Sequence, residues 1–445
     1  MRYKISFSEV KQNIAIAIPV AISQLGHMTV AIADTVMAGR LGALPLAAAT
    51  LAMSVFIPFL MIAIGMSYGI TPLVAQSDGE GSSKHISEIL KTSLVLNLGV
   101  DILLFVLLLI IAQLLPMMNP DSSIVALAKP FFIIQAISLL PLMFFLILKQ
   151  FCEGLAITKQ ATIITIVANV INIGLIYLFI YGTWGFPKLG FNGIAYATLI
   201  ARIFMMVAMG GFFLAYKDFG IYRSLYRQVS ISKTKLNELF KTSMPIGLQL
   251  MLESGAFGFA AILAGWIGAN EIAAHQISLN IAAVTYMAAT GIASATTVRV
   301  GNEWGRKDMS AMRNAAAAAF VIILVYEIIS CLFFVVFKNQ LPLLYIKETN
   351  IVMLSASLLL ITALFQLSDG IQVVAMGALR GIGDVRIPTI VAVFSYWIIG
   401  LPAGYLLGFN LKMGVQGIWY GLLIGLSISA VMLTVRLRNK VKNLV

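Results

Sequence analysis

Charged residues are scarce in this chain of 445 residues. Asp, Glu, Lys and Arg make up 11% of it and hydrophobic residues 60%, whereas soluble domains are about one quarter charged and about half apolar. This shortage excludes a soluble globular enzyme and a disordered protein. The two cysteines, Cys152 and Cys331, are too few for a disulfide scaffold. Both lie in or beside apolar stretches, where cysteine behaves as a small hydrophobic residue.

Groups that perform enzyme chemistry are also missing. The chain has three histidines, His27, His85 and His275, which lie far apart and show no metal-binding spacing. No phosphate-binding P-loop is present, and the GIGD stretch at 381–384 is typical of a turn. A membrane-embedded transferase would need a metal or nucleophile cluster, which we do not find. The sequence therefore predicts no enzyme, no catalytic residue and no cofactor.

Long apolar runs fill the rest of the chain. A transmembrane helix needs about 20 apolar residues, and lipid offers no partners for free backbone groups, so unbroken runs of this length favour helices over barrel strands. We predict an all-α membrane protein with twelve transmembrane helices and no large soluble domain. The predicted spans are 13–38, 46–74, 90–115, 126–150, 161–182, 190–216, 239–267, 272–300, 315–337, 351–377, 387–409 and 414–437.

The basic residues predict the orientation of these spans. With both termini in the cytoplasm, 23 of the 30 Lys and Arg residues fall on the cytoplasmic side and six on the outer side, as the positive-inside rule requires. Arg202 is the one basic residue deep inside a predicted span. The net charge of +12 therefore reflects the cytoplasmic loops, and we expect no nucleic-acid partner. Short loops and the absence of a cleaved signal suggest a multi-pass protein of the bacterial inner membrane.

The two halves of the chain repeat each other. In one constant register Pro19 matches Pro245 and Gly39 matches Gly265, while GIAYATLI at 193–200 matches GIWYGLLI at 417–424 in a slightly shorter register. Six spans per copy give both copies the same orientation, so the repeat is parallel, and such repeats bind substrate in the cleft between the two halves. We predict an N-terminal lobe at 1–216, a cytoplasmic linker at 217–238 and a C-terminal lobe at 239–445.

Acidic residues inside the spans are the main candidates for function. A charge there costs about 2.5–3.5 kcal/mol on insertion scales, so such residues usually face a cavity or a partner. Asp34 in span one, Glu253 in span seven and Asp369 in span ten together favour a cation or proton site. Asp101 and Glu327, which match in the same register as the two prolines, occupy equivalent places in spans three and nine. They either anchor these helices to polar neighbours, the interpretation we favour, or take part in coupling.

Neutral polar and aromatic residues follow some of the same helices. Asn172 in span five and Gln276 and Asn280 in span eight form polar stripes, which either link helices or line a cavity. Gln366 lies three residues before Asp369. Phe257 and Tyr286 can hold an organic cation by cation–π contact, at about 0.5–2 kcal/mol, although aromatic stripes more often serve packing.

The pattern resembles a known family. Twelve spans in two parallel lobes, with Asp34 in ADTVMAGRLG, Glu253 in LESGAF, AAHQISLN at 273–280 and LSDGIQVVAMGALRGIGD at 367–384, resemble the multidrug and toxic compound extrusion (MATE) transporters, in particular the bacterial NorM-type branch. The resemblance covers essentially the whole chain.

The resemblance implies secondary active export of cationic, amphiphilic small molecules in exchange for Na+ or H+. It assigns cation binding or proton coupling to Asp34, Glu253 and Asp369, with Na+ on Glu253 and Asp369. It makes Asn172, Gln276 and Tyr286 lining residues. The chain has Ile176 where family members often carry a second Asn or Asp, which weakens the first-lobe coordination sphere. We expect a monomer in the lipid bilayer.

A flippase for lipid-linked oligosaccharides is the main alternative of similar architecture. Its pyrophosphate-bearing substrate would require basic residues in the cavity. The sequence offers Arg202 against five acids inside spans, which favours a site for cations.

Overall fold

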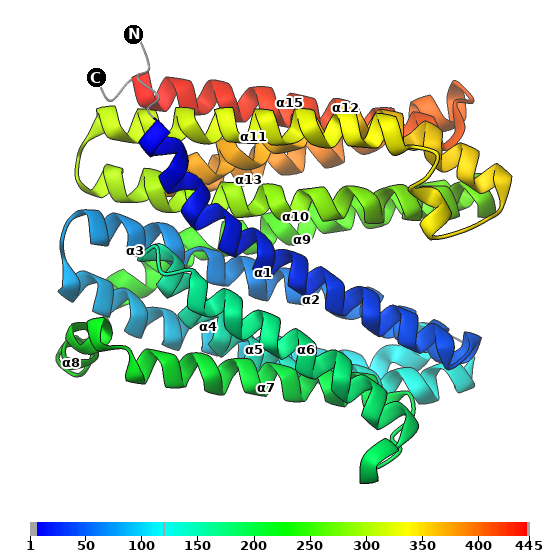
Figure 1. Ribbon diagram of the computed structural model, residues 1–445, viewed down its shortest axis with the longest axis horizontal. Coiled ribbons are helices and arrows are strands. Elements are labelled where there is room, and N and C mark those ends of the chain that lie inside the picture. The colour runs from blue at the N-terminus through cyan, green and yellow to red at the C-terminus, as the bar shows by residue number, and fades with distance from the viewer. Residues whose placement is uncertain (1–6, 119–120, 443–445) are drawn as a thin grey trace. The chain divides into compact units, whose positions relative to one another are not determined.

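The computed structural model describes residues 7–118 and 121–442, and these residues are almost entirely helical (Figure 1). The helices are α1 (Phe7–Arg40), α2 (Ala43–Tyr68), α3 (Ile70–Gly79), α4 (Ser83–Met118), α5 (Ser122–Gly154), α6 (Lys159–Tyr181), α7 (Asn192–Ala215), α8 (Gly220–Gln228), α9 (Lys233–Ile267), α10 (Ala269–Gly305), α11 (Met309–Phe337), α12 (Thr349–Gly381), α13 (Arg386–Val393), α14 (Leu401–Tyr405) and α15 (Gly414–Lys442). Short turns form η1 (Thr183–Gly185), η2 (Lys217–Phe219) and η3 (Pro342–Leu344), and wider π-helical turns form η4 (Phe394–Gly400) and η5 (Leu406–Asn410).

Within the described residues, twelve helical segments are long and apolar enough to cross a membrane. The predicted all-α membrane fold with twelve transmembrane helices is therefore confirmed. Several helices extend beyond the apolar runs into polar sequence. The predicted linker at 217–238 contains α8, and α9 already begins at Lys233.

The helices group into two compact units, which we call the N-unit and the C-unit. The N-unit is Ile22–Leu248, and the C-unit combines the described residues up to Ala21 with those from Gln249 onward. Both boundaries fall inside helices, because α1 and α9 each contribute one part to each unit. The predicted lobes at 1–216 and 239–445 follow chain order instead, and that division stays a prediction.

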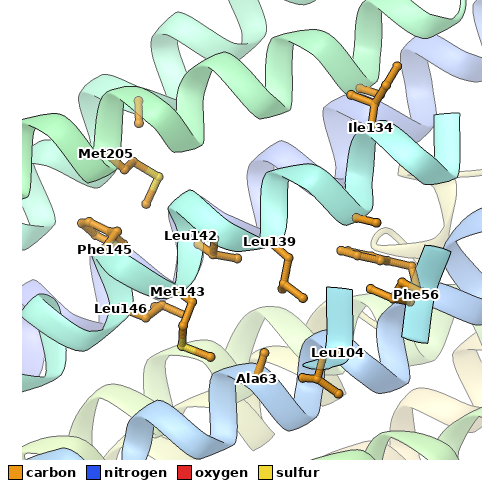
Figure 2. Close-up of a cluster of buried hydrophobic side chains, with 14 of the residues drawn as sticks. Phe56, Ala63, Leu104, Ile134, Leu139, Leu142, Met143, Phe145, Leu146 and Met205 are labelled. Atoms are coloured by element: carbon orange, nitrogen blue, oxygen red, sulfur yellow. The ribbon is translucent and has the colours of Figure 1, made fainter. Parts of the chain in front are cut away.

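The N-unit is built around α5. This helix packs against α2, α3, α4 and α7, and most of its middle is buried. Figure 2 shows Leu139, Met143 and Leu146 of α5 beside Ala63 of α2 in an apolar cluster. Burial on every side explains why α5 is apolar all round rather than along one stripe.

The C-unit has the same plan around α12. This helix packs against α10, α11 and α15, as α5 packs against α2, α4 and α7. The repeat in the sequence therefore corresponds to a repeat in packing, with α12 in the place of α5. In the register that matches Pro19 to Pro245, Met143 of the apolar cluster corresponds to Asp369, so the C-unit carries an acid where the N-unit is apolar.

Glycines let the last two spans of the C-unit pack closely. A Cβ at Gly417 would lie 2.5 Å from the backbone nitrogen of Gly408, and one at Gly425 would lie 2.5 Å from the carbonyl oxygen of Ser395. A Cβ at Gly421, between them, would meet the backbone of Gly404. Small residues at such spacing are typical of close helix contacts in membranes.

Candidate functional site

Glu253 lies at the centre of a polar cluster in the C-unit. Its carboxylate accepts a hydrogen bond from Gln249 Nε2 at 3.0 Å, one helical turn earlier in α9. It also accepts one from Gln372 Nε2 of α12 at 3.4 Å. Gln372 Oε1 in turn accepts a hydrogen bond from the Tyr396 hydroxyl of η4 at 3.1 Å. Glu253 is thereby connected to two neighbouring spans through one amide.

Asp369 of α12 is buried near this cluster. It is 5% exposed and lies close enough to Glu253 for the two charges to act on each other. Arg380, at the cytoplasmic end predicted for α12, donates a hydrogen bond to Gln249 Oε1 at 3.2 Å and places a positive charge near Glu253. The structure thus brings together the two predicted acids of spans seven and ten.

Aromatic rings surround the same cluster. The ring of Phe257 lies 6.2 Å from that of Phe365 and 5.8 Å from that of Tyr396, measured between centroids. Tyr286 of α10 is near enough to interact electrostatically with Tyr396. Phe257 and Tyr286, both named from the sequence, are therefore each close to Tyr396, the residue whose hydroxyl donates to Gln372.

The other predicted polar residues of the C-unit have different neighbours. Gln366 is fully buried, and its side-chain amide donates hydrogen bonds to Thr285 and to the carbonyl oxygen of Ala282 on α10. Gln276 donates to Asn280 at 3.2 Å on an exposed part of α10. Gln372, which the sequence analysis did not name as a site residue, is the amide that reaches Glu253.

The predicted N-unit residues form a second, smaller cluster. The Asp34 carboxyl group of α1 lies against the Thr198 hydroxyl of α7. Asn172 of α6 donates a hydrogen bond to the same hydroxyl at 3.2 Å. One oxygen of Asp34 and the side-chain oxygen of Asn172 are buried without a hydrogen-bond partner. Ile176 is buried one turn beyond Asn172 and offers no ligand.

Thr198 was not predicted as a site residue, because the string GIAYATLI matches the second half of the chain through its glycine and hydrophobic residues. Its hydroxyl accepts a hydrogen bond from Asn172 of α6 and lies near the carboxyl group of Asp34 of α1. Thr or Ser at a helix interface commonly makes such a contact, so a polar residue inside that apolar string was the available signal.

The equivalent acids Asp101 and Glu327 are both buried, at 0% and 1% exposure, and neither carboxylate has a hydrogen-bond partner. The positive charge of Arg202 on α7 acts on the Asp101 carboxyl group. Glu327 packs against Gly370 of α12, where a Cβ would lie 2.5 Å from its Cγ, next to Asp369. The two acids thus share a place in the repeat but have different charged neighbours.

Lys149, one of the basic residues that the sequence predicts on the cytoplasmic side, lies near the C-terminal end of α5 and is 2% exposed. Its Nζ lies 3.7 Å from Glu153 Oε1, and both side chains are buried. A Lys and a Glu four residues apart face the same side of a helix, which explains how this basic residue is buried as a pair.

The C-unit cluster contains both charged and neutral oxygen atoms. Glu253 and Asp369 supply charge, while Gln372 donates its amide nitrogen to Glu253 and its oxygen accepts from the Tyr396 hydroxyl. In the described part of the chain no three His, Cys, Asp or Glu side chains gather closely enough to hold a metal ion. A Na+ ion at Glu253 and Asp369 would therefore complete its shell with amide, phenol or backbone oxygens, as alkali cations do with carbonyl oxygens in channels.

Curated relatives match the chain over nearly its whole length. It is 32% identical over 435 residues to the multidrug resistance protein NorM of Aliivibrio fischeri, covering 96% of this chain and 94% of that protein. It is 31% identical over 442 residues to the multidrug resistance protein MdtK of Yersinia pseudotuberculosis, covering 97% and 95%.

Solved structures match the fold. A crystal structure of MATE in the straight conformation superimposes with a TM-score of 0.91 at 22% identity, covering 98% of this chain and 97% of that one. The eukaryotic MATE transporter AtDTX14 gives a TM-score of 0.87 at 22% identity, covering 98% of both chains. The model of the MatE family matches residues 19–178 and 245–406, one stretch in each half of the repeat. Because both halves match this family model and the NorM and MdtK relatives align along nearly the whole chain, the protein belongs to the MatE family.

Proposed function

We propose that this protein is a secondary active multidrug exporter. It exchanges cationic, amphiphilic small molecules for Na+ or H+ through alternating access of two six-helix lobes. The observation that carries the proposal is the acid pair of partly buried Glu253 and buried Asp369, with Phe257 and Tyr396 close by. The names of the NorM and MdtK relatives, multidrug resistance proteins, support the same substrate class.

The acid pair supplies the competition that an exchanger needs. Two neighbouring carboxylates inside membrane spans are neutralised by Na+, by protons or by an organic cation, and binding of one disfavours the others. The membrane potential favours inward movement of the coupling ion by about 2.3 kcal/mol per charge per 100 mV. We further propose that the protein works as a monomer in the bacterial inner membrane, with both termini in the cytoplasm, and catalyses no covalent reaction.

The buried basic residues fit this proposal better than a lipid flippase. Lys149 is paired with Glu153, and Arg202 lies near Asp34 and Asp101. Each basic group thus has acidic neighbours, so neither leaves a free positive charge for a pyrophosphate group.

Ethidium efflux from proteoliposomes tests the proposal. A Na+ gradient at fixed pH and a pH gradient without Na+ are imposed separately, and the gradient that drives efflux identifies the coupling ion. Glu253→Gln and Asp369→Asn should each reduce gradient-driven efflux to the level of protein-free vesicles, because each removes one of the two charges that the cations share.

Glu348→Gln is the matched control. Glu348 is an exposed acid of the same unit, just before α12, and its side chain does not cap that helix. This variant should transport like the unmodified protein. Unchanged efflux by folded Glu253→Gln or Asp369→Asn protein at equal reconstitution would overturn the assignment of the site.

A further inference from the structure

Arg202 of the N-unit lies near two acids. From α7, its positive charge acts on Asp34 of α1 and on Asp101 of α4. Its Nη1 donates a hydrogen bond to Ser138 Oγ of α5 at 2.7 Å. The guanidinium group is thus hydrogen-bonded to α5 and lies within electrostatic range of the acids on α1 and α4.

Arg202 is not committed to either acid. Among the ion pairs of the described residues, none joins it closely to Asp34 or Asp101, and both oxygens of Asp101 and one of Asp34 lack hydrogen-bond partners. The other cation in this interior, Lys149, is already paired with Glu153. One positive charge therefore acts on two carboxylates, that of buried Asp101 and that of partly buried Asp34.

The C-unit has no counterpart of this arginine. The register that aligns GIAYATLI with GIWYGLLI places Leu426, which is fully buried, opposite Arg202. Glu327, the counterpart of Asp101, accordingly lies beside Asp369 without an arginine at that place in the repeat. A basic residue at this place in the repeat is thus a feature of the N-unit, where Asp34 is the candidate coupling acid. In the C-unit the positive charge near Glu253 comes from Arg380 of α12 instead.

We propose that Arg202 is a positioning residue that acts as an internal counter-charge for Asp34 and competes there with the transported cation. Asp101 sets the strength of this competition by drawing part of the guanidinium charge away from Asp34. The inference rests on the proposed function, because it requires that Asp34 binds a cation during transport.

Competition of this kind has a kinetic signature. Without Arg202 the carboxylate of Asp34 has no internal counter-charge, so a cation binds more tightly and leaves more slowly. Without the charge of Asp101, Arg202 neutralises Asp34 more fully, so a cation binds more weakly. A purely structural arginine would instead lower the amount of folded protein without moving affinity in opposite directions in the two variants.

The experiment measures tetraphenylphosphonium binding and ethidium transport by the full chain in nanodiscs and proteoliposomes. Arg202→Leu, which installs the residue of the repeat partner, should tighten tetraphenylphosphonium binding about tenfold and lower both KM and kcat for ethidium, a coupling within the usual range between linked sites. Asp101→Asn should weaken binding about tenfold and raise KM. In the Arg202→Leu background the effect of Asp101→Asn should fall below about threefold, since Asp101 acts through the arginine.

Three controls keep the outcome interpretable. Arg202→Lys, which keeps the charge, should retain near-native KM, and Arg202→Gln replaces Arg202→Leu if the leucine variant does not fold. In an Asp34→Asn background the Arg202 substitution should no longer change binding.

Unchanged affinity in both Arg202→Gln and Asp101→Asn, or equal effects of Asp101→Asn with and without Arg202, would overturn the inference. If Asp34→Asn itself transports and binds normally while Glu253→Gln does not, the role of Asp34 fails and the C-unit site stands. If none of the acid variants changes transport, the proposed function fails.

Discussion

Residue by residue, composition identified the acids but not their partners. Glu253 and Asp369 stand out because a carboxylate in an apolar run is rare and costly. Gln366 and Gln372 flank Asp369 symmetrically at three residues on either side, so spacing alone gave no reason to prefer one. The packing of α12 distinguishes them, because the Gln366 amide donates a hydrogen bond to Thr285 of α10 and the Gln372 amide donates one to Glu253.

Tyr396 provides a test of this relay. Tyr396→Phe removes the hydroxyl that donates to Gln372 and leaves the ring beside Phe257 in place. Loss of one such hydrogen bond costs about 0.5–1.5 kcal/mol, so apparent affinity for the coupling ion should fall by about two- to tenfold with maximal efflux largely retained. Titration of the coupling-ion gradient in ethidium efflux measures it. Tyr405→Phe, at an exposed tyrosine of the same span, should leave the affinity unchanged; equal effects of the two variants would contradict the relay.

At the scale of whole elements, hydrophobic run length predicted where membrane helices occur but not their ends or their contacts. The runs predicted the spans because lipid requires a continuous apolar surface. Polar residues continue α9 back to Lys233 and α10 forward to Gly305, since hydrogen bonding along a helix does not stop where hydrophobicity does. The close packing of α15 against α14 and its flanking turns was missed, because glycine is frequent in all membrane helices.

Gly421 tests that packing. Gly421→Ala would place a methyl group against the backbone of Gly404 and 2.6 Å from the carbonyl oxygen of Gly400, and backbone cannot move aside as a flexible side chain can. Overpacking of this kind costs about 1–3 kcal/mol, so the melting temperature in detergent should drop by several degrees. Gly258→Ala in α9 is the control, because nothing lies within 4 Å of its added Cβ. There the better helix propensity of alanine should leave stability equal or raise it by up to about 1 kcal/mol. If Gly421→Ala were as stable as Gly258→Ala, the close contact of α15 with α14 would not contribute to stability.

At the scale of the whole molecule, the internal repeat was readable because the two copies kept small residues at matching turns of the chain. The packing of α5 and α12 against equivalent partners is its structural counterpart. The boundaries of the compact units could not be predicted from the sequence. They fall within α1 and α9, where no glycine-rich or polar stretch marks a break. Contacts between distant segments set these boundaries, and a single sequence does not reveal such contacts.

Orientation in the membrane is the remaining property of the whole molecule that the chain itself encodes. The excess of Lys and Arg on one side predicts that η1 lies outside and α8 inside the cell. Trp184 in η1 is 91% exposed, and Ser224 in α8 is also exposed, so single cysteines at these positions should react readily with a maleimide. In a background with Cys152 and Cys331 replaced by alanine, a membrane-impermeant maleimide should label Trp184→Cys in intact spheroplasts and Ser224→Cys only after the membrane is opened. The reverse pattern would invert every span, and with it the direction in which the proposed exporter moves its substrates. Labelling of both cysteines in intact spheroplasts would instead mean that α7, the span between them, does not cross the bilayer as predicted, or that the membrane was already breached, which a cytoplasmic marker protein labelled in parallel would reveal.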